Sequence, residues 1–125
     1  MRILVVDDHE AVRKGVSAIV QTLNDVEVCG EAVNGLEAID KARELRPDLV
    51  ILDITMPVVD GFKAARLIRD ILPEASILLL SMHDGAKLRH VAMSVGAHGF
   101  VCKDQGVAVL RQAIQSMTQH QTFFM

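Results

Sequence analysis

The chain has 125 residues, and half of them are hydrophobic, so it can bury the core of one domain without disulfides or a structural metal. Its net charge of -3, with acidic and basic residues interspersed, argues against nucleic-acid binding by this segment and against a basic membrane-binding patch. The start becomes acidic too early for a signal peptide, and there is no apolar run of membrane-spanning length, so the expected location is the cytoplasm.

Short apolar segments alternate with longer segments whose apolar residues recur three and four positions apart. The short segments are typical of buried parallel strands, and the longer ones of amphipathic helices. In chain order, the predicted elements are strand 3–6, helix 12–23, strand 26–33, helix 36–45, strand 49–52, helix 62–72, strand 77–80, helix 88–95, strand 99–102 and helix 110–117. Asn34 and Asp84 stand where helix N-caps belong, and Pro47 and Pro73 mark the ends of two helices.

Strict alternation of strand and helix predicts a parallel sheet with helices on both of its faces. Three of the strands are uniformly apolar and should be central, whereas the second and the fifth are mixed and should be the edges. The expected fold is therefore one doubly wound (βα)5 domain of the flavodoxin-like kind, residues 1–125, with a five-stranded sheet in the order 2-1-3-4-5.

Polar residues that can carry chemistry follow four of the predicted strands. In an open parallel sheet the ligand crevice lies outside the carboxyl ends of the strands, where the strand order reverses. Asp7 and Asp8 follow the first strand, Asp53 follows the third, Ser81 the fourth and Lys103 the fifth. The topology therefore predicts that three carboxylates, a hydroxyl and an amine converge on one crevice.

Three neighbouring carboxylates repel one another, and a divalent cation relieves that repulsion. A small site of hard oxygen ligands suits Mg²⁺, whereas no set of histidines and cysteines has the spacing of a zinc site. Beside Mg²⁺ and Lys103, Asp53 is equipped to attack a phosphoryl group and form an acyl phosphate. Ser81 can donate a hydrogen bond to a phosphoryl oxygen.

Each of these residues also has a purely structural interpretation. Asp7 or Asp8 alone would most simply cap the first helix, Asp53 would be a turn residue, and Lys103 would pair with any neighbouring acid. The convergence of several strand ends favours the functional interpretation. His9 is expected only to shape the rim of the crevice, without a chemical role.

Four stretches make the sequence similar to the receiver domains of bacterial two-component systems. They are Ile-Leu-Val-Val-Asp-Asp-His at 3–9, Pro-Asp-Leu-Val-Ile-Leu-Asp-Ile-Thr-Met-Pro at 47–57 with Asp-Gly at 60–61, Leu-Leu-Leu-Ser at 78–81, and Gly-Ala-His-Gly-Phe-Val-Cys-Lys at 96–103. The resemblance covers essentially the whole chain. It implies a signalling switch rather than an enzyme, which receives its phosphoryl group from a sensor histidine kinase or a phosphotransfer protein.

The resemblance also implies how the acidic residues divide the work. Asp53 is the expected phosphoacceptor. Asp8 is the expected main carboxylate ligand of Mg²⁺, and Asp7 supports it largely through ordered water. Asp53 and the backbone carbonyl of Thr55 are expected to hold the same ion.

The same resemblance implies a conformational switch. Lys103 is expected to contact the phosphoryl group, and Ser81 is the hydroxyl drawn toward it. Phe100, at a position where tyrosine is commoner, is the aromatic residue that turns inward into the vacated space. The surface made by the fourth helix, the fifth strand and the fifth helix then changes between two packings.

The motifs at 7–9, 103–104 and 122–124 resemble regulators of the NarL/FixJ type, in which a helix-turn-helix DNA-binding domain follows the receiver. The apolar ending at 123–125 favours a longer protein over a stand-alone regulator. The expected output is then transcription through that further domain, and homodimers formed on phosphorylation are common in such families.

Three other functions fit the same fold. A phosphatase with an aspartyl phosphate needs a second acid two residues after its nucleophile, where this chain has Thr55. A flavin-binding electron carrier needs a hydroxyl- and glycine-rich loop after the first strand, where Asp7 and Asp8 would repel phosphate. A receiver-like adaptor that is never phosphorylated is a weaker alternative, because Asp7, Asp8 and Asp53 are all present. The sequence alone does not exclude this alternative.

Overall fold

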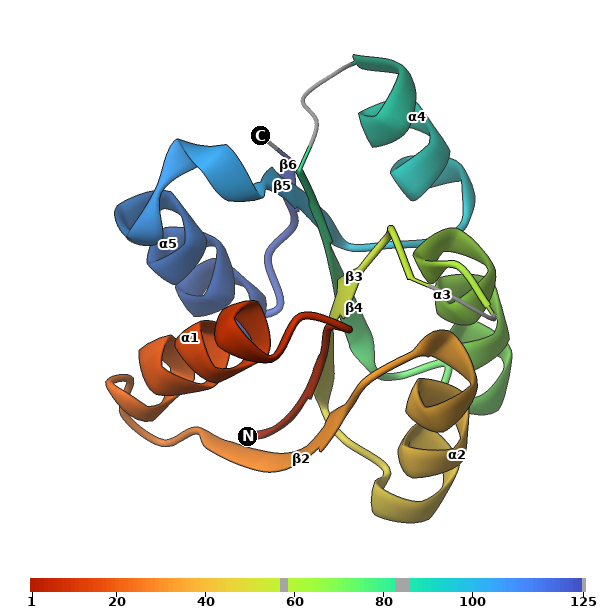
Figure 1. Ribbon diagram of the computed structural model, residues 1–125, viewed down its shortest axis with the longest axis horizontal. Helices are drawn as coiled ribbons and strands as arrows, with labels where there is room; N and C mark the ends of the chain where they lie inside the picture. The colour runs from red at the N-terminus through yellow and green to blue at the C-terminus, as the bar shows by residue number, and fades with distance from the viewer. Residues whose placement is uncertain (57–58, 83–85, 125) are drawn as a thin grey trace.

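The computed structural model describes residues 1–56, 59–82 and 86–124 (Figure 1). Within them the elements are β1 Arg2–Val6, α1 Glu10–Gln21, β2 Glu27–Ala32, α2 Gly35–Leu45, β3 Leu49–Asp53, α3 Gly61–Ile71, β4 Ser76–Ser81, α4 Ala86–Ser94, β5 Gly99–Cys102, a 3₁₀ turn Lys103–Gln105, α5 Val107–Thr118 and β6 Phe123–Phe124. All the predicted strands and helices are therefore present.

The strands pair in parallel in one sheet, in the order β2-β1-β3-β4-β5-β6. In Figure 1, α1 and α5 cover one face of this sheet, and α2, α3 and α4 cover the other. This arrangement confirms the predicted doubly wound, flavodoxin-like fold and the order of its first five strands. The strand order reverses between β1 and β3, so the switch point lies where these two strands end.

The central strands form the core because both of their faces are covered by helices. Every residue of β3, β4 and β5 is buried. Alternate side chains of β1 point to opposite layers: Leu4 and Val6 pack with α2 and α3, and Ile3 and Val5 pack with α1 and α5. Uniformly apolar strands are what this two-sided burial requires.

A sixth strand corrects the prediction of a five-stranded sheet with the fifth strand at its edge. β6 pairs with β5, with Gly99 opposite Phe123 and Phe100 opposite Phe124. Phe123 packs against the layer of α1 and α5, and Phe124 packs against the opposite layer. A strand of two residues has no periodicity that sequence analysis can detect, so only its tertiary contacts identify it.

The helix boundaries agree with their predicted signals. The side chain of Asn34 accepts a hydrogen bond of 2.8 Å from the backbone N–H of Glu37 and caps α2, as predicted. α2 and α3 end two residues before Pro47 and Pro73. The other predicted N-cap, Asp84, lies outside the described residues.

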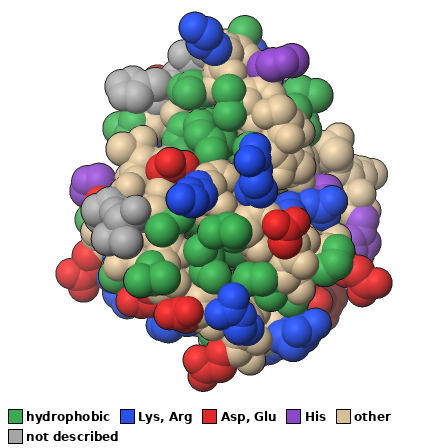
Figure 2. Space-filling view, turned by 90° about the vertical axis from the view of Figure 1, so that its right-hand side faces the viewer, with side chains coloured by type: hydrophobic (Ala, Val, Ile, Leu, Met, Phe, Trp, Pro, Cys, Tyr) green, Lys and Arg blue, Asp and Glu red, His purple; other side chains and the backbone are tan. Residues whose placement is uncertain are grey.

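The face that carries α2, α3 and α4 has basic and acidic side chains interspersed with apolar ones (Figure 2). This mixture agrees with the small net charge of the chain. None of the helices in the described ranges is both long and apolar enough to cross a bilayer.

Candidate functional site

The predicted crevice residues lie together at the carboxyl edge of the sheet. Asp53 is the last residue of β3, Ser81 is the last residue of β4, and Lys103 directly follows β5. The register places these ends level with one another, because Asp53 pairs with Leu80 and Ser81 pairs with Cys102. Asp7 and Asp8 follow β1 at the same edge.

Lys103 connects the two buried carboxylates. Its Nζ lies 2.7 Å from Oδ2 of Asp7 and 3.3 Å from Oδ1 of Asp53. The side chains of Asp7 and Asp53 are 1% and 2% exposed, and that of Lys103 is 10% exposed. Ion pairs as buried as this one are poorly screened by water, so they hold the three side chains in a defined arrangement.

Burial raises the pKa of Asp53 above its ordinary value, because the charged carboxylate loses its hydration. The Lys103 ammonium lowers the pKa of Asp53, and the neighbouring Asp7 carboxylate raises it. The backbone N–H of Thr55 lowers it again by donating to Oδ1 of Asp53 over 3.3 Å. Burial is the largest of these effects.

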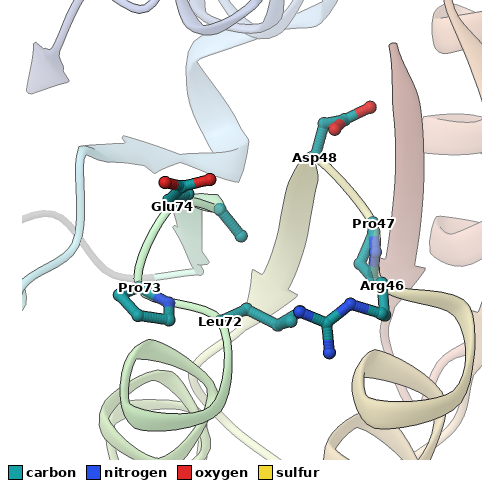
Figure 3. Close-up of a pocket in the computed structure, with 7 residues that line it drawn as sticks. Arg46, Pro47, Asp48, Leu72, Pro73 and Glu74 are labelled. Atoms are coloured by element: carbon teal, nitrogen blue, oxygen red, sulfur yellow. The ribbon is translucent and has the colours of Figure 1, made fainter.

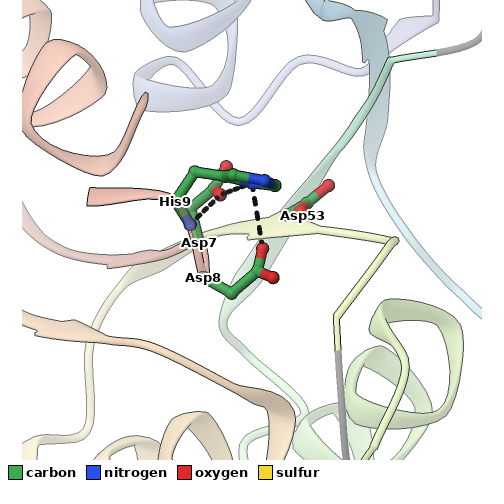
Figure 4. Close-up of side chains that lie close together, drawn as sticks. All are labelled: Asp7, Asp8, His9 and Asp53. Atoms are coloured by element: carbon green, nitrogen blue, oxygen red, sulfur yellow. Dashed lines mark hydrogen bonds and ion pairs between the residues drawn. The ribbon is translucent and has the colours of Figure 1, made fainter. Parts of the chain in front are cut away.

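Asp8 and His9, which are both exposed, complete the acidic cluster (Figure 4). One ligand atom from each of Asp7, Asp8, His9 and Asp53 lies within 4.8 Å of the others. Nδ1 of His9 is 3.4 Å from Oδ1 of Asp7 and 3.2 Å from Oδ1 of Asp8. His9 was expected to have no chemical role, because a histidine after two acids gives no signal for the direction of its side chain.

The structural interpretation of Asp7 and Asp8 as helix caps is not supported. The N-cap residue of α1 is His9. Oδ1 of Asp7 accepts the backbone N–H of His9 over 2.9 Å, and its Oδ2 accepts from Lys103. The Asp7 carboxylate therefore joins the turn after β1 to the residue after β5.

Arg13 is a further residue that sequence analysis missed. Its Nη1 donates to the backbone carbonyl of Asp7 over 3.0 Å, and its Nε donates to Oε1 of Glu31 over 2.9 Å. The Arg13 side chain is 12% exposed. It therefore links the turn after β1 to β2, a contact between residues 18 positions apart that no local motif reveals.

The two switch candidates lie deeper than the acids. Ser81 is fully buried at the end of β4, one strand from Lys103. Phe100 is fully buried in the middle of β5, within the core cluster that includes Ala92 of α4. Phe124 of β6 packs against the same cluster. Phe100 is thus near the sheet edge that carries the acids but is not part of the acidic cluster.

A pocket at the opposite edge of the sheet is separate from this site (Figure 3). It is lined by Arg46, Pro47, Asp48, Leu72, Pro73, Glu74 and Ala75, which precede the amino ends of β3 and β4. Oδ2 of Asp48 accepts the backbone N–H of Arg2 over 2.8 Å. That carboxylate therefore fixes the start of β1.

The donor set at the carboxyl edge fits a divalent cation. The cluster contains three carboxylates, and the two that are almost fully buried, Asp7 and Asp53, share the ammonium of Lys103. Concentrated negative charge in a buried pocket is costly without a compensating cation. Carboxylate oxygens are the ligands that Mg²⁺ prefers, so the cluster of Asp7, Asp8 and Asp53 could hold it.

Known proteins share both the sequence pattern and the fold. The family model of the response regulator receiver domain matches residues 3–115. The response regulator protein VraR of Staphylococcus aureus is 35% identical over 124 residues, which are 99% of this chain and 59% of VraR. The chain therefore spans about three fifths of the length of that curated relative.

Two solved structures give the same result. A two-component response regulator of the LuxR family from Aurantimonas sp. SI85-9A1 superposes with a TM-score of 0.92 at 36% identity, over 98% of this chain and 87% of that one. CheY in the CheX–CheY–BeF₃–Mg²⁺ complex from Borrelia burgdorferi has a TM-score of 0.88 at 27% identity, over 94% and 89%. The chain belongs to the response regulator receiver domains of two-component signalling systems.

Proposed function

We propose that residues 1–125 form one receiver domain that works as a phosphorylation-activated switch, with Asp53 as the phosphoacceptor. The observation that carries the proposal is the buried contact of Lys103 with both Asp7 and Asp53. An ammonium beside a strand-end carboxylate can offset the charge that develops on a transferring phosphoryl group.

The proposed phosphodonor is a phosphohistidine of a sensor kinase or of a phosphotransfer protein. A carboxylate oxygen of Asp53 forms a bond to phosphorus, the phosphorus–nitrogen bond breaks, and the imidazole leaves with the bonding electrons. The chain itself acts as a signalling domain rather than an enzyme, with at most slow autodephosphorylation. Because the proposed phosphodonor is a sensor kinase or a phosphotransfer protein, we expect the chain to work in the cytoplasm.

We propose that the acidic cluster binds Mg²⁺ through Asp8, Asp53 and the backbone carbonyl of Thr55, with Asp7 acting through water. Bound there, the ion would neutralise charge on the phosphoryl oxygens. The burial of Asp7 and Asp53 and the closeness of Asp8 support this assignment. The related CheY structure is described as a complex with BeF₃ and Mg²⁺, which agrees with such a site.

After transfer, Ser81 is proposed to donate its hydroxyl to a phosphoryl oxygen, and Lys103 to move from Asp7 toward the phosphoryl group. Phe100 and its neighbours in β5 then repack, and the surface of α4, β5 and α5 shifts to its second arrangement. The proposed output is transcription through a DNA-binding domain outside this sequence, as the LuxR-family relative suggests. Phosphorylation would also favour a homodimer.

The test is incubation of the purified chain with Mg²⁺ and acetyl phosphate, followed by mass spectrometry. We expect a mass increase of one phosphoryl group that maps to Asp53 and is absent in Asp53→Asn. Asp60→Asn is the matched control, because Asp60 caps α3 outside the acidic cluster, and we expect it to be labelled normally. Absence of labelling in the wild type would instead favour an adaptor that is never phosphorylated, and labelling of Asp53→Asn would show that another residue is the phosphoacceptor.

A further inference from the structure

The imidazole of His9 adds a nitrogen donor to the acidic cluster. In Figure 4 its ring lies over the Asp7 and Asp8 carboxylates, with Asp53 beside them. Nδ1 is 3.2 Å from Oδ1 of Asp8 and 3.4 Å from Oδ1 of Asp7, and the donor set including Asp53 spans no more than 4.8 Å. The ring is therefore close enough to share one ion with the acids.

The backbone of His9 is held in place on both sides. Its N–H donates to Oδ1 of Asp7 over 2.9 Å, and its carbonyl accepts the N–H of Arg13 over 2.9 Å at the start of α1. Arg13 is fixed in turn by Glu31 and by the Asp7 carbonyl. Only the two side-chain torsions of His9 remain to be set, so a bound ion would need to order little of the chain.

The spacing of the His9 and Asp8 donor atoms is that of neighbouring ligands of one octahedral ion. Ligands at right angles around an ion with bonds of about 2.1 Å lie about 3 Å apart, and opposite ligands lie about 4.2 Å apart. The distance of 3.2 Å between Nδ1 of His9 and Oδ1 of Asp8, a proposed direct ligand, is close to the first of these distances. Lys103 approaches the other oxygen of Asp7, Oδ2, and not the Oδ1 atom that lies beside Nδ1 of His9.

This inference rests on the proposed function, in which the acidic cluster binds a divalent cation. We infer that Nδ1 of His9 is a further ligand of that cation. His9 then gives the site a preference for first-row transition ions such as Mn²⁺ over Mg²⁺. Imidazole nitrogen is a ligand for first-row transition ions, with Mn²⁺ at the weak end of that series, whereas Mg²⁺ prefers oxygen and keeps most of its water. The occupant of the site then depends on the ratio of the two metals available to the protein.

Mn²⁺ is the probe that tests this inference. Its binding to the full chain is followed by the electron paramagnetic resonance of free Mn²⁺, and Mg²⁺ affinity is measured by competition. We expect pulsed measurements on the bound ion to show coupling to one ¹⁴N nucleus in the wild type. We expect His9→Asn to lose that coupling and to lower the preference for Mn²⁺ over Mg²⁺ about tenfold. His90→Asn, which changes an exposed histidine on α4, should keep both properties.

Several outcomes would overturn the inference while leaving the proposed function intact. One is bound Mn²⁺ without ¹⁴N coupling in the wild type, a result that needs no variant to fold. A second is an unchanged preference for Mn²⁺ over Mg²⁺ in His9→Asn. A third is tighter Mn²⁺ binding by His9→Asn than by the wild type, which would show that His9 acts as a competing cation. If neither ion binds the wild type, or if Asp8→Ala does not abolish the binding, the proposed metal site itself fails. The inference then fails with it.

Discussion

The Lys103 ammonium lies closer to Asp7 than to Asp53, at 2.7 Å from Oδ2 of one and 3.3 Å from Oδ1 of the other. Asp7 therefore holds the lysine beside the proposed phosphoacceptor without requiring a phosphoryl group. A phosphoryl group on Asp53 would compete with Asp7 for the same ammonium. The lysine can thus report phosphorylation by changing partners.

We predict that Lys103→Ala keeps the fold but uncouples phosphorylation from the switch. The substitution removes the cation that can move between Asp7 and the phosphoryl group. In two-dimensional NMR spectra of the wild type, addition of BeF₃⁻ and Mg²⁺ should change the chemical shifts of residues in α4, β5 and α5. The same changes should occur in the control Lys14→Ala, because Lys14 is exposed. Those shifts should be absent in Lys103→Ala. Loss of the folded circular dichroism spectrum would show instead that the lysine is structural.

The raised pKa of Asp53 predicts that this carboxylate destabilises the fold once it is ionised. The folded state holds the Asp53 proton more tightly than the unfolded state does, so stability is lost as pH rises from the unfolded pKa, about 4, through the folded pKa. Asp53→Asn should therefore raise the free energy of unfolding by on the order of 1 kcal/mol at pH 7. The difference should shrink toward pH 4.

Urea unfolding of the wild type and Asp53→Asn, measured from pH 4 to pH 8, tests this pH dependence. A chelator is present throughout, because bound metal would mask the cost of the buried charge. Asp60→Asn is again the control, because its carboxylate lies on the surface. A stabilisation of Asp53→Asn that is the same at every pH would contradict a raised pKa as its cause.

Arg13 is predicted to position the acidic turn after β1. Arg13→Ala removes its hydrogen bond to the Asp7 carbonyl and its contact with Glu31. We expect Mg²⁺ affinity to fall about tenfold, as is typical when support for a metal ligand is lost. Titration calorimetry measures this. Lys14→Ala is the matched control, because Lys14 contacts the same glutamate at 3.5 Å, and its affinity should be close to that of the wild type. Equal losses in both variants would point to surface charge rather than to positioning.

Two glycines should respond to alanine in opposite directions. A Cβ at Gly61 would lie 2.3 Å from the backbone carbonyl of Asp53 and 2.3 Å from Cα of Ile54, so the backbone that carries the phosphoacceptor would have to move. Gly61→Ala should destabilise the fold by about 3 kcal/mol and impair labelling of Asp53. In the middle of α1, a Cβ at Gly15 meets no atom of the described residues within 4 Å. Gly15→Ala should stabilise the fold by about 1 kcal/mol. Thermal unfolding of both variants would show whether the signs differ.

Most of the fold and the meeting of the acids with Lys103 followed from the sequence alone. Uniformly apolar runs predicted which strands are central, and parallel strands must end at one edge of the sheet. Asp7 directly follows β1, Asp53 is the last residue of β3, and Lys103 directly follows β5. Their convergence therefore depends on hydrophobic pattern and topology, which local sequence encodes.

Other features were decided only by the tertiary structure, because they depend on contacts between distant residues and on side-chain torsions. β6 exists because Phe123 and Phe124 find apolar partners on opposite sides of the sheet, not because two residues favour a strand. The contact of Arg13 with Glu31 depends on how α1 packs beside β2. The direction of the His9 ring depends on a rotamer, and no periodicity in the sequence specifies it.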